Sequence, residues 1–250
     1  MIYARVSYYH QEKCGFIVED KIQFIEGSVF GWHRLTGETA NLAEVSFLPP
    51  VQPSKVVAVG LNYKDHIQEM GLDTPKNPTL FLKPSTAVIG DKDSIHIPEM
   101  SRQVDYEGEL ALVINKRASH VRPDQAKNYI LGYTCLNDVT ARDLQAVDGQ
   151  WIRAKGFDTF CPLGPIVTDQ VDPQSLNIKT CLNGKIRQSS NTREFLWNVY
   201  ELVSFVSCVM TLLPGDVITT GTPSGIGPMQ AGDVVEVTIE GIGTLQNFVS

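Results

Sequence analysis

The chain has 250 residues, of which 42% are hydrophobic and 20% are charged, so it can bury a large core and fold alone. Its formal net charge is −7 and no run of lysine and arginine exceeds two residues, which excludes the clustered positive charge of a nucleic-acid groove or an anionic-membrane site. No signal-peptide core and no run of roughly 18 apolar residues is present, so we expect a cytoplasmic protein.

Residues 1–50 form the first predicted unit, a small N-terminal β segment. Short strand-like pieces alternate there with polar turns, and the unit ends at "FLPPVQPSK", whose three prolines make a stiff connection. We expect residues 51–250 to form one large domain.

The large domain opens with the buried strand "KVVAVGLNY" and with one or two helical turns in "YKDHIQEMG", which Gly71 ends. Strand sequences then follow one another, most of them bounded by Gly, Pro, Asn or Asp. Helices are predicted over Pro123–Tyr129 and over 193–213, where apolar residues recur at helical spacing. Because strands dominate and do not alternate regularly with helices, the pattern favours a strand-dominated α+β fold with a rolled, mostly antiparallel sheet.

The stretch "VDYEGELALVI" places acidic residues at alternate positions before an apolar strand. Residues i and i+2 of a strand share a face, so the side chains of Glu107 and Glu109 point the same way. That face continues into Ala111 and Val113 and becomes buried, where neighbouring anions repel unless a cation compensates them. The alternative is an exposed strand end whose acids are solvated.

A third acid, Asp138, ends the strand sequence "YILGYTCL" in "CLNDVTARDLQ", and Asp143 is its rival. Three carboxylates suit Mg²⁺ or Mn²⁺ better than zinc, which prefers His or Cys ligands. The five cysteines form no CxxC pair, which is typical of reduced thiols.

Six motifs in order carry a resemblance to a known family: "GLNYKDHIQEMG", "FLKPSTAVIG", "VDYEGELALVI", "NDVTARDLQ", "RAKGFDTFCPLGP" and "TTGTPSGIG". From about Val56 to the C-terminus, the chain resembles the fumarylacetoacetate hydrolase (FAH) family. The resemblance implies a rolled mixed β-sheet of the sandwich or barrel kind, with a few flanking helices and a small N-terminal β segment. It also implies a homodimer.

The resemblance assigns roles to the acids and to a group around them. Glu107, Glu109 and Asp138 correspond to the ligands of the family's metal, Mg²⁺ or Mn²⁺. His66 and Glu69 lie three residues apart on one side of a helical turn, where Glu69 would orient the imidazole that takes a proton from water. The alternative for this pair is an exposed helical histidine beside an acid.

Further residues are carried over by the same match. Lys155, otherwise a surface lysine, would point into the site and stabilise an enolate or oxyanion as a third catalytic residue. Thr222 would donate its hydroxyl to a substrate carboxylate. The predicted substrate-binding residues are Lys83, Ser85, Arg142, Gln145 and Thr222.

The implied activity is that of a divalent-metal-dependent hydrolase. It would cleave a C–C bond in a small β-dicarbonyl acid, an acylpyruvate or a fumarylacetoacetate-like acid, through a metal-chelated enolate. The same enolate would serve an isomerase or decarboxylase of 2-hydroxyhepta-2,4-diene-1,7-dioate or 5-carboxymethyl-2-oxo-hex-3-ene-1,7-dioate. It would serve an oxaloacetate decarboxylase or tautomerase equally. A family member without catalytic activity is the remaining alternative, and the expected partner is a small oxo acid.

Overall fold

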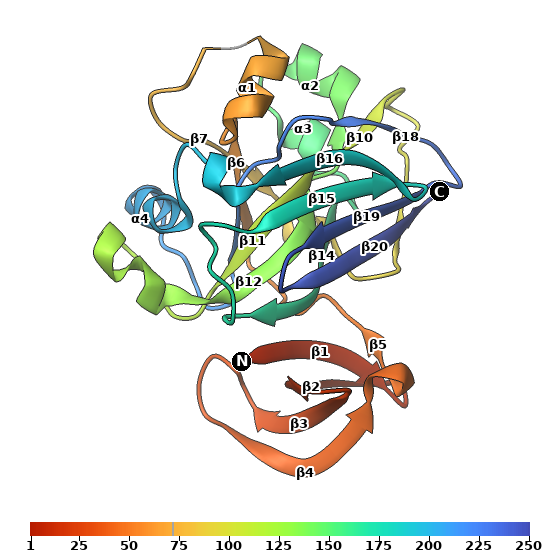
Figure 1. The fold of residues 1–250 in the computed structure, drawn as a ribbon, viewed down its shortest axis with the longest axis vertical. Helices are drawn as coiled ribbons and strands as arrows, with labels where there is room; N and C mark the ends of the chain where they lie inside the picture. Colours follow the sequence, from red (N-terminus) through yellow and green to blue (C-terminus); the bar gives the residue numbers. More distant parts are fainter. Residues whose placement is uncertain (72) are drawn as a thin grey trace.

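Three β-sheets carry the part of the chain described in this computed structural model, residues 1–71 and 73–250 without the side chains of His66 and Met70. The N-terminal strands lie below the rest of the molecule in Figure 1. They join the main sheet through β1, which pairs antiparallel with β14 at Ile2–Thr168 and Tyr3–Val167.

The largest sheet has 12 strands and runs in the order β4-β3-β2-β1-β14-β12-β11-β17-β6-β7, while β5 pairs with β1 and β8 with β14. It mixes antiparallel pairs with the parallel pairs β17–β6 and β14–β8. Its strands are β1 (Ile2–Tyr8), β2 (Gln11–Val18), β3 (Lys21–Gly27), β4 (His33–Asn41), β5 (Ser46–Phe47), β6 (Val56–Gly60), β7 (Thr79–Lys83), β8 (Val88–Ile89), β11 (Gly108–Ile114), β12 (Ile130–Asn137), β14 (Cys161–Thr168) and β17 (Val217–Thr219).

Two smaller sheets complete the architecture. A five-stranded sheet, β16-β15-β19-β20-β9, lies across β11, β12 and β14 in Figure 1, and a three-stranded sheet has the order β13-β10-β18. Their strands are β9 (Ser94–Ile95), β15 (Asn177–Leu182), β16 (Lys185–Asn191), β19 (Val234–Ile239), β20 (Gly243–Val249), β10 (Val104–Tyr106), β13 (Thr140–Ala141) and β18 (Gly227–Met229).

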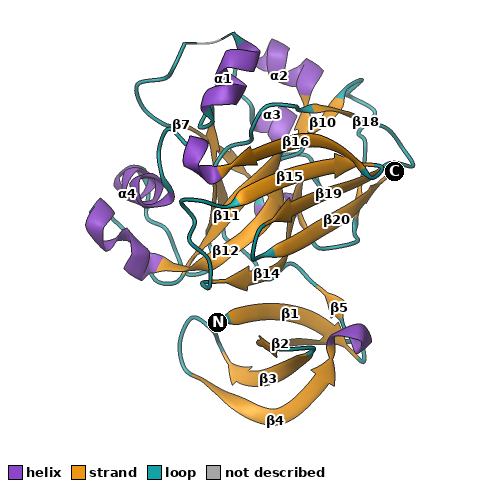
Figure 2. Ribbon diagram, in the orientation of Figure 1, coloured by secondary structure: helices purple, strands orange, loops and turns teal. Residues whose placement is uncertain are grey.

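Helices are short and flank the sheets, as Figure 2 shows, with α1, α2 and α3 gathered at one end of the molecule. The predicted strand-dominated α+β fold of rolled mixed sheets with a few helices is confirmed. The helices are α1 (Lys64–Met70), α2 (Arg142–Asp148), α3 (Ile152–Lys155) and α4 (Val199–Val209), with 3₁₀ turns η1 (Leu42–Glu44), η2 (Ser85–Ala87), η3 (Pro123–Tyr129) and η4 (Thr192–Glu194).

The helix predictions are partly right. Gly71 ends α1 in a left-handed conformation, with φ 64°, as expected for a glycine at that position. The segment Pro123–Tyr129 is helical but 3₁₀. The helix predicted over 193–213 is too long, because Asn198 and Glu201 form a reciprocal cap that starts α4 at Val199, and Met210 is already extended.

Strand β11 separates two hydrophobic cores. Leu110, Leu112 and Ile114 pack into the core beneath the five-stranded sheet and α4, while Ala111 and Val113 face the core shared with β1 and β14. Both faces of β11 are therefore covered, which explains why its whole apolar run is buried. Glu109 lies on the Ala111 face, as the alternation predicted.

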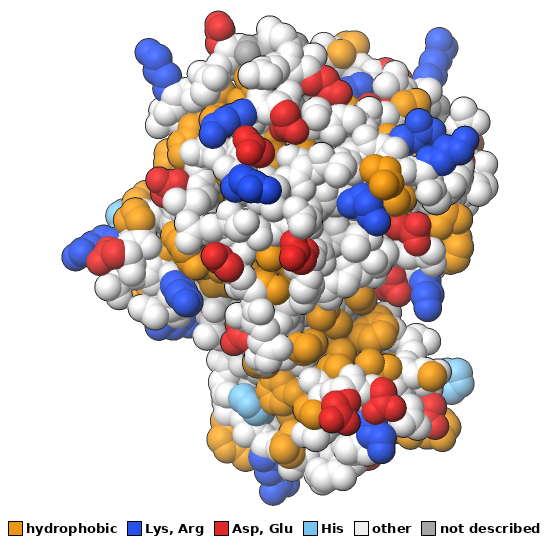
Figure 3. Space-filling model, in the orientation of Figure 1, with side chains coloured by type: hydrophobic (Ala, Val, Ile, Leu, Met, Phe, Trp, Pro, Cys, Tyr) orange, Lys and Arg blue, Asp and Glu red, His pale blue; other side chains and the backbone are white. Residues whose placement is uncertain are grey.

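The visible surface has mixed charge. In Figure 3 the basic and acidic side chains are interspersed, and hydrophobic side chains gather around the N-terminal strands and their junction with the rest. Within the described residues, none of the helices has the length and apolar character that crossing a membrane requires.

Candidate metal centre and pocket

Three carboxylates meet where two sheets join. Glu107 lies in the break between β10 and β11, Glu109 lies in β11, and Asp138 directly follows β12. The antiparallel register sets Gly108 opposite Asn137, and the Asp138 N–H donates to the Glu107 carbonyl oxygen at 2.8 Å. One carboxylate oxygen from each acid lies within 4.8 Å of the others, and all three side chains are buried. The structure thus brings together the three acids that the sequence singled out.

Two buried lysines are paired with these acids. The Lys155 Nζ donates to Glu107 Oε2 at 2.8 Å and to Asp138 Oδ2 at 2.6 Å. The Lys83 Nζ approaches from the edge strand β7 and donates to the other Asp138 oxygen at 2.6 Å. Lys155 and Lys83 are only 2% and 0% exposed, so these pairs are shielded from solvent.

Arg142, at the first turn of α2, links Asp105 of β10 to Glu107 of the triad. Its Nε donates to Asp105 Oδ2 at 2.8 Å, and its Nη2 donates to Glu107. Its Nη1 donates to Gln145 Oε1. Asp105 is therefore neutralised by an arginine beside the triad. The rival acid Asp143 accepts from Ser101 Oγ and from the Arg102 N–H instead, and it is not among the converging acids.

The electrostatics of the triad are uneven. Burial alone would raise the pKa of Glu107, but the charges and hydrogen bonds of Lys155 and Arg142 hold that pKa well below its usual range. Burial raises the pKa of Glu109 well above its usual range, and the neighbouring Asp138 and Glu107 raise it further. Burial acts to lower the pKa of Lys155, but Asp138 and Glu107 raise it above its ordinary value, so the ammonium form persists.

The surroundings of Glu109 fit a bound cation. Its Oε2 accepts from the Thr219 hydroxyl and, at 2.8 Å, from the Gly221 N–H. Within the described part of the chain no lysine, arginine or histidine forms an ion pair with it, in contrast to Glu107 and Asp138. A divalent cation would supply the missing positive charge, and an all-oxygen donor set suits Mg²⁺ or Mn²⁺.

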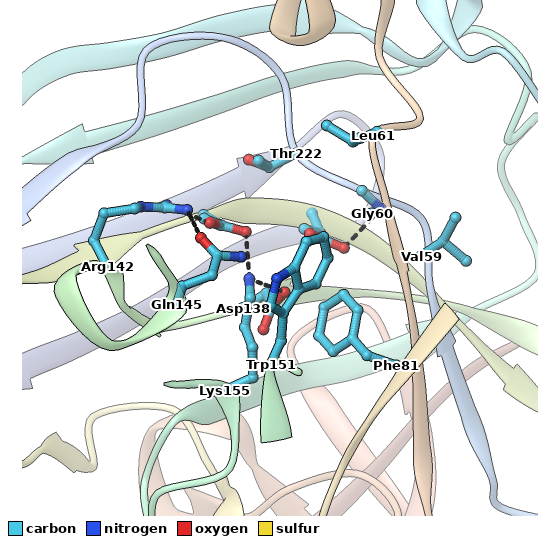
Figure 4. A pocket seen from close by; sticks show the side chains of 13 residues that line it. Val59, Gly60, Leu61, Phe81, Asp138, Arg142, Gln145, Trp151, Lys155 and Thr222 are labelled. Carbon is cyan, nitrogen blue, oxygen red and sulfur yellow. Dashed lines mark hydrogen bonds and ion pairs between the residues drawn. The ribbon is translucent and has the colours of Figure 1, made fainter. Parts of the chain in front are cut away.

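The acids open into a cavity of about 90 Å³, here called the acidic pocket. Figure 4 shows Arg142 and Gln145 on one side of it and the rings of Phe81 and Trp151 on the other. A polar half and an apolar half thus face each other. The lining residues are Val59, Gly60, Leu61, Phe81, Glu107, Glu109, Asp138, Arg142, Gln145, Trp151, Lys155, Gly221 and Thr222.

Thr222 and Lys83, two of the predicted substrate-binding residues, form hydrogen bonds within the protein. The Thr222 hydroxyl lines the pocket, but it donates to the Gly108 carbonyl oxygen at 2.9 Å and accepts from Gln188 at 2.8 Å. Lys83 lies behind Asp138 and does not line the pocket. Ser85 lines a separate cavity of about 510 Å³ beside Arg5.

The predicted general-base pair lies on α1. The Glu69 carboxylate is exposed and accepts from the Gly225 N–H at 3.0 Å, which ties α1 to the loop after β17. The His66 side chain lies outside the described residues, so its predicted role stays a prediction.

Sequence reasoning missed the apolar half of the pocket. Phe81 lies in the quoted motif "FLKPSTAVIG" but was not selected. Trp151 precedes Lys155 by four residues, one helical turn, and that spacing was the available signal. The partner of Glu109, Thr219, opens the motif "TTGTPSGIG", and its contribution depends on the pairing of β17 with β11.

Comparisons with known proteins agree with this architecture. The family model described as fumarylacetoacetate (FAA) hydrolase C-terminal matches residues 55–250, and the one described as Rv2993c-like, N-terminal matches residues 1–50.

Two solved structures cover nearly the same length. The X-ray structure of 5-carboxymethyl-2-hydroxymuconate delta-isomerase from Mycobacterium smegmatis has a TM-score of 0.94 at 45% identity, covering 100% of this chain and 99% of that one. The structure of 2-hydroxyhepta-2,4-diene-1,7-dioate isomerase from Mycobacterium marinum has a TM-score of 0.93 at 43% identity, covering 100% and 98%. Among curated relatives, oxaloacetate tautomerase Fahd2a, mitochondrial, from Rattus norvegicus is 43% identical over 219 residues, which are 83% of this chain and 70% of that protein.

Proposed function

Because the chain belongs to the fumarylacetoacetate hydrolase family of enzymes, we propose that it is a divalent-metal-dependent tautomerase of a small 2-oxo acid, with oxaloacetate as the substrate. The reaction moves a proton between carbon C3 and the oxygen on C2, so that keto and enol forms interconvert. The three named relatives, two isomerases and a tautomerase, support a proton shift over bond cleavage.

The observation that carries the proposal is the placement of Lys155. Its ammonium group is fixed between Glu107 and Asp138, lines the acidic pocket and is kept protonated by those neighbours. Negative charge collects on the C2 oxygen when the C3 proton leaves. A buried, preorganised cation at that position stabilises this charge more than water would.

The metal has one role in the proposal. Glu107, Glu109 and Asp138 would hold it, and it would supply positive charge that lowers the energy of an enolate.

The chain's own residues orient the substrate and limit water. Arg142 and Gln145 present polar groups on one side of the pocket, where they position the 2-oxo acid end. Phe81, Trp151 and Leu61 form the opposite, apolar side. A proton shift consumes no water, so a wall that reduces the access of water suits tautomerisation better than hydrolysis.

Hydrolysis of an acylpyruvate, the activity expected first from the sequence, is the second candidate. One observation favours it: helix α1, with His66 and Glu69, starts three residues after the pocket-lining Leu61. Those side chains would activate the water that hydrolysis requires.

The test follows the ultraviolet absorbance of freshly dissolved enol oxaloacetate with chelator-treated protein, with and without Mg²⁺ or Mn²⁺. We expect protein and metal together to accelerate the loss of the enol over a metal-only blank. Glu107→Gln should abolish the acceleration, and Asp143→Asn, which changes an acid outside the triad, should preserve it.

Acetylpyruvate is measured in parallel. Enol loss no faster than the blank would contradict the tautomerase. Metal-dependent release of pyruvate from acetylpyruvate, with no effect on oxaloacetate, would instead establish the second candidate.

A further inference from the structure

Two aromatic rings separate the acidic pocket from a second, outer hollow. Phe81 and Trp151 line both spaces, and their rings meet edge to face with centroids 5.3 Å apart and an interplanar angle of 73°. The outer hollow has a volume of about 420 Å³. It lies at the surface, because its lining residues Leu82 and Ile152 are 42% and 65% exposed.

The Trp151 ring is held in place from several directions. The backbone carbonyl oxygen of Trp151 accepts from the Lys155 N–H at 2.9 Å. One helical turn therefore connects Trp151 to the pocket lysine. Behind the ring, a Cβ atom on Gly60 would lie only 2.9 Å from Trp151 Cζ3, closer than such contacts occur. Phe81 supports the ring at its edge. The partition is therefore built into the fold.

The acidic pocket on the inner side of this partition is small. Its volume of about 90 Å³ is less than a quarter of the 420 Å³ of the outer hollow. That space suits a four-carbon oxo acid. A seven-carbon dioate would extend into the plane of the two rings.

Charge reinforces the size limit. Among the described residues, the cations that line the pocket are Lys155 and Arg142, and both are already paired with the triad or with Asp105. The distal carboxylate of a seven-carbon dioate, pressed against the aromatic wall, would lose its hydration and gain no partner there.

We infer that Trp151 is a specificity-determining residue that restricts the pocket to 2-oxo acids of about four carbons. Removing the indole joins the acidic pocket to the outer hollow, where a longer chain lies against Leu80 and Leu82 and its distal carboxylate reaches solvent. The inference rests on the proposed function only in taking a 2-oxo acid as the ligand.

Binding tests the inference without turnover. Isothermal titration with Mn²⁺ present compares 2-oxobutyrate, a four-carbon probe, with 2-oxopimelate, a seven-carbon 2-oxo dioate. We expect wild type to bind the short probe about tenfold more tightly or better, in line with the discrimination a closed apolar wall provides. Trp151→Ala should reduce the ratio of the two dissociation constants about tenfold, because 2-oxopimelate should bind more tightly.

Two further variants keep the result interpretable. Trp151→Leu retains an apolar side chain and opens the partition if the alanine variant folds poorly. Ile152→Ala removes a side chain from the outer hollow alone and should leave the wild-type ratio unchanged.

Equal affinities in wild type, no binding of either probe, or a ratio that fails to shift in both Trp151 variants would overturn the inference. So would an equal shift in Ile152→Ala. A wild-type protein that discriminates the probes as expected but does not tautomerise oxaloacetate supports this inference and removes only the proposed reaction.

Discussion

Lys83 and Asp138 form an ion pair that solvent barely reaches, with an Nζ–Oδ1 distance of 2.6 Å and side-chain exposures of 0% and 2%. The lysine comes from edge strand β7 and the aspartate from the end of β12, so the pair ties the sheet edge to the acidic triad. Removing Lys83 would leave the buried Asp138 compensated by Lys155 alone.

We therefore expect Lys83→Met to lower the free energy of unfolding by up to about 3 kcal/mol, the lower end of the cost of breaking a buried pair, because Lys155 still compensates Asp138. Urea denaturation of the chelator-treated protein measures it. Arg34→Met, which breaks an exposed pair with Glu26, is the control and should change stability far less. Similar losses in the two variants would contradict the shielding of the Lys83 pair.

Glu109→Gln should separate metal binding from folding. Burial and the charges of Asp138 and Glu107 keep the pKa of Glu109 high, so its ionised form is unfavourable without a cation. The neutral amide removes that repulsion, and the chelator-treated variant should melt at or above the wild-type temperature.

The rise in melting temperature that saturating Mn²⁺ gives to wild type should be largely lost in Glu109→Gln, because one ligand charge is missing. Differential scanning fluorimetry with and without Mn²⁺ measures both effects. An undiminished metal-induced shift would show that Glu109 is not a ligand.

The cysteines should differ sharply in reactivity. Burial raises the pKa of the Cys161 thiol to about 12, and burial likewise raises that of Cys135 to about 12, so both remain protonated at pH 8. Cys208 is exposed. Brief iodoacetamide treatment followed by mass spectrometry should label Cys208 and spare Cys161 and Cys135 until the protein is unfolded. Early labelling of Cys161 would contradict its burial.

Asn198→Ala should destabilise α4 from its start. The Asn198 side chain accepts from the N–H groups of Tyr200 and Glu201, and Glu201 accepts in return from the Asn198 N–H. Loss of such a cap costs about 1 kcal/mol. Thermal unfolding should show a lower midpoint, whereas Asn198→Ser, which keeps a capping oxygen, should recover most of it.

The sequence predicted those features that depend on local pattern. Alternate acids before an apolar strand indicated the shared face of Glu107 and Glu109, and Gly71 indicated the end of α1. The spacing of Asn198 and Glu201 also matches a reciprocal helix cap. The apolar periodicity continues beyond both ends of α4, however, so the predicted helix was too long.

Features that depend on the order of strands in the sheets could not be predicted from the sequence. The pairing of Lys83 with Asp138 requires β7 to lie beside β6, and Thr219 reaches Glu109 only because β17 pairs with β11. The role of Phe81 and Trp151 as a wall likewise arises from the contact of an edge strand with a helical turn far along the chain. Such contacts leave no periodic signal in the sequence.

Strand β11 has hydrogen-bonded neighbours at both edges, β12 and β17, and a hydrophobic core on each face. Its amide protons should therefore exchange with deuterated solvent only through unfolding of the whole domain, among the slowest in the molecule. The strand that holds Glu109 is thus expected to form a rigid base for the acidic triad.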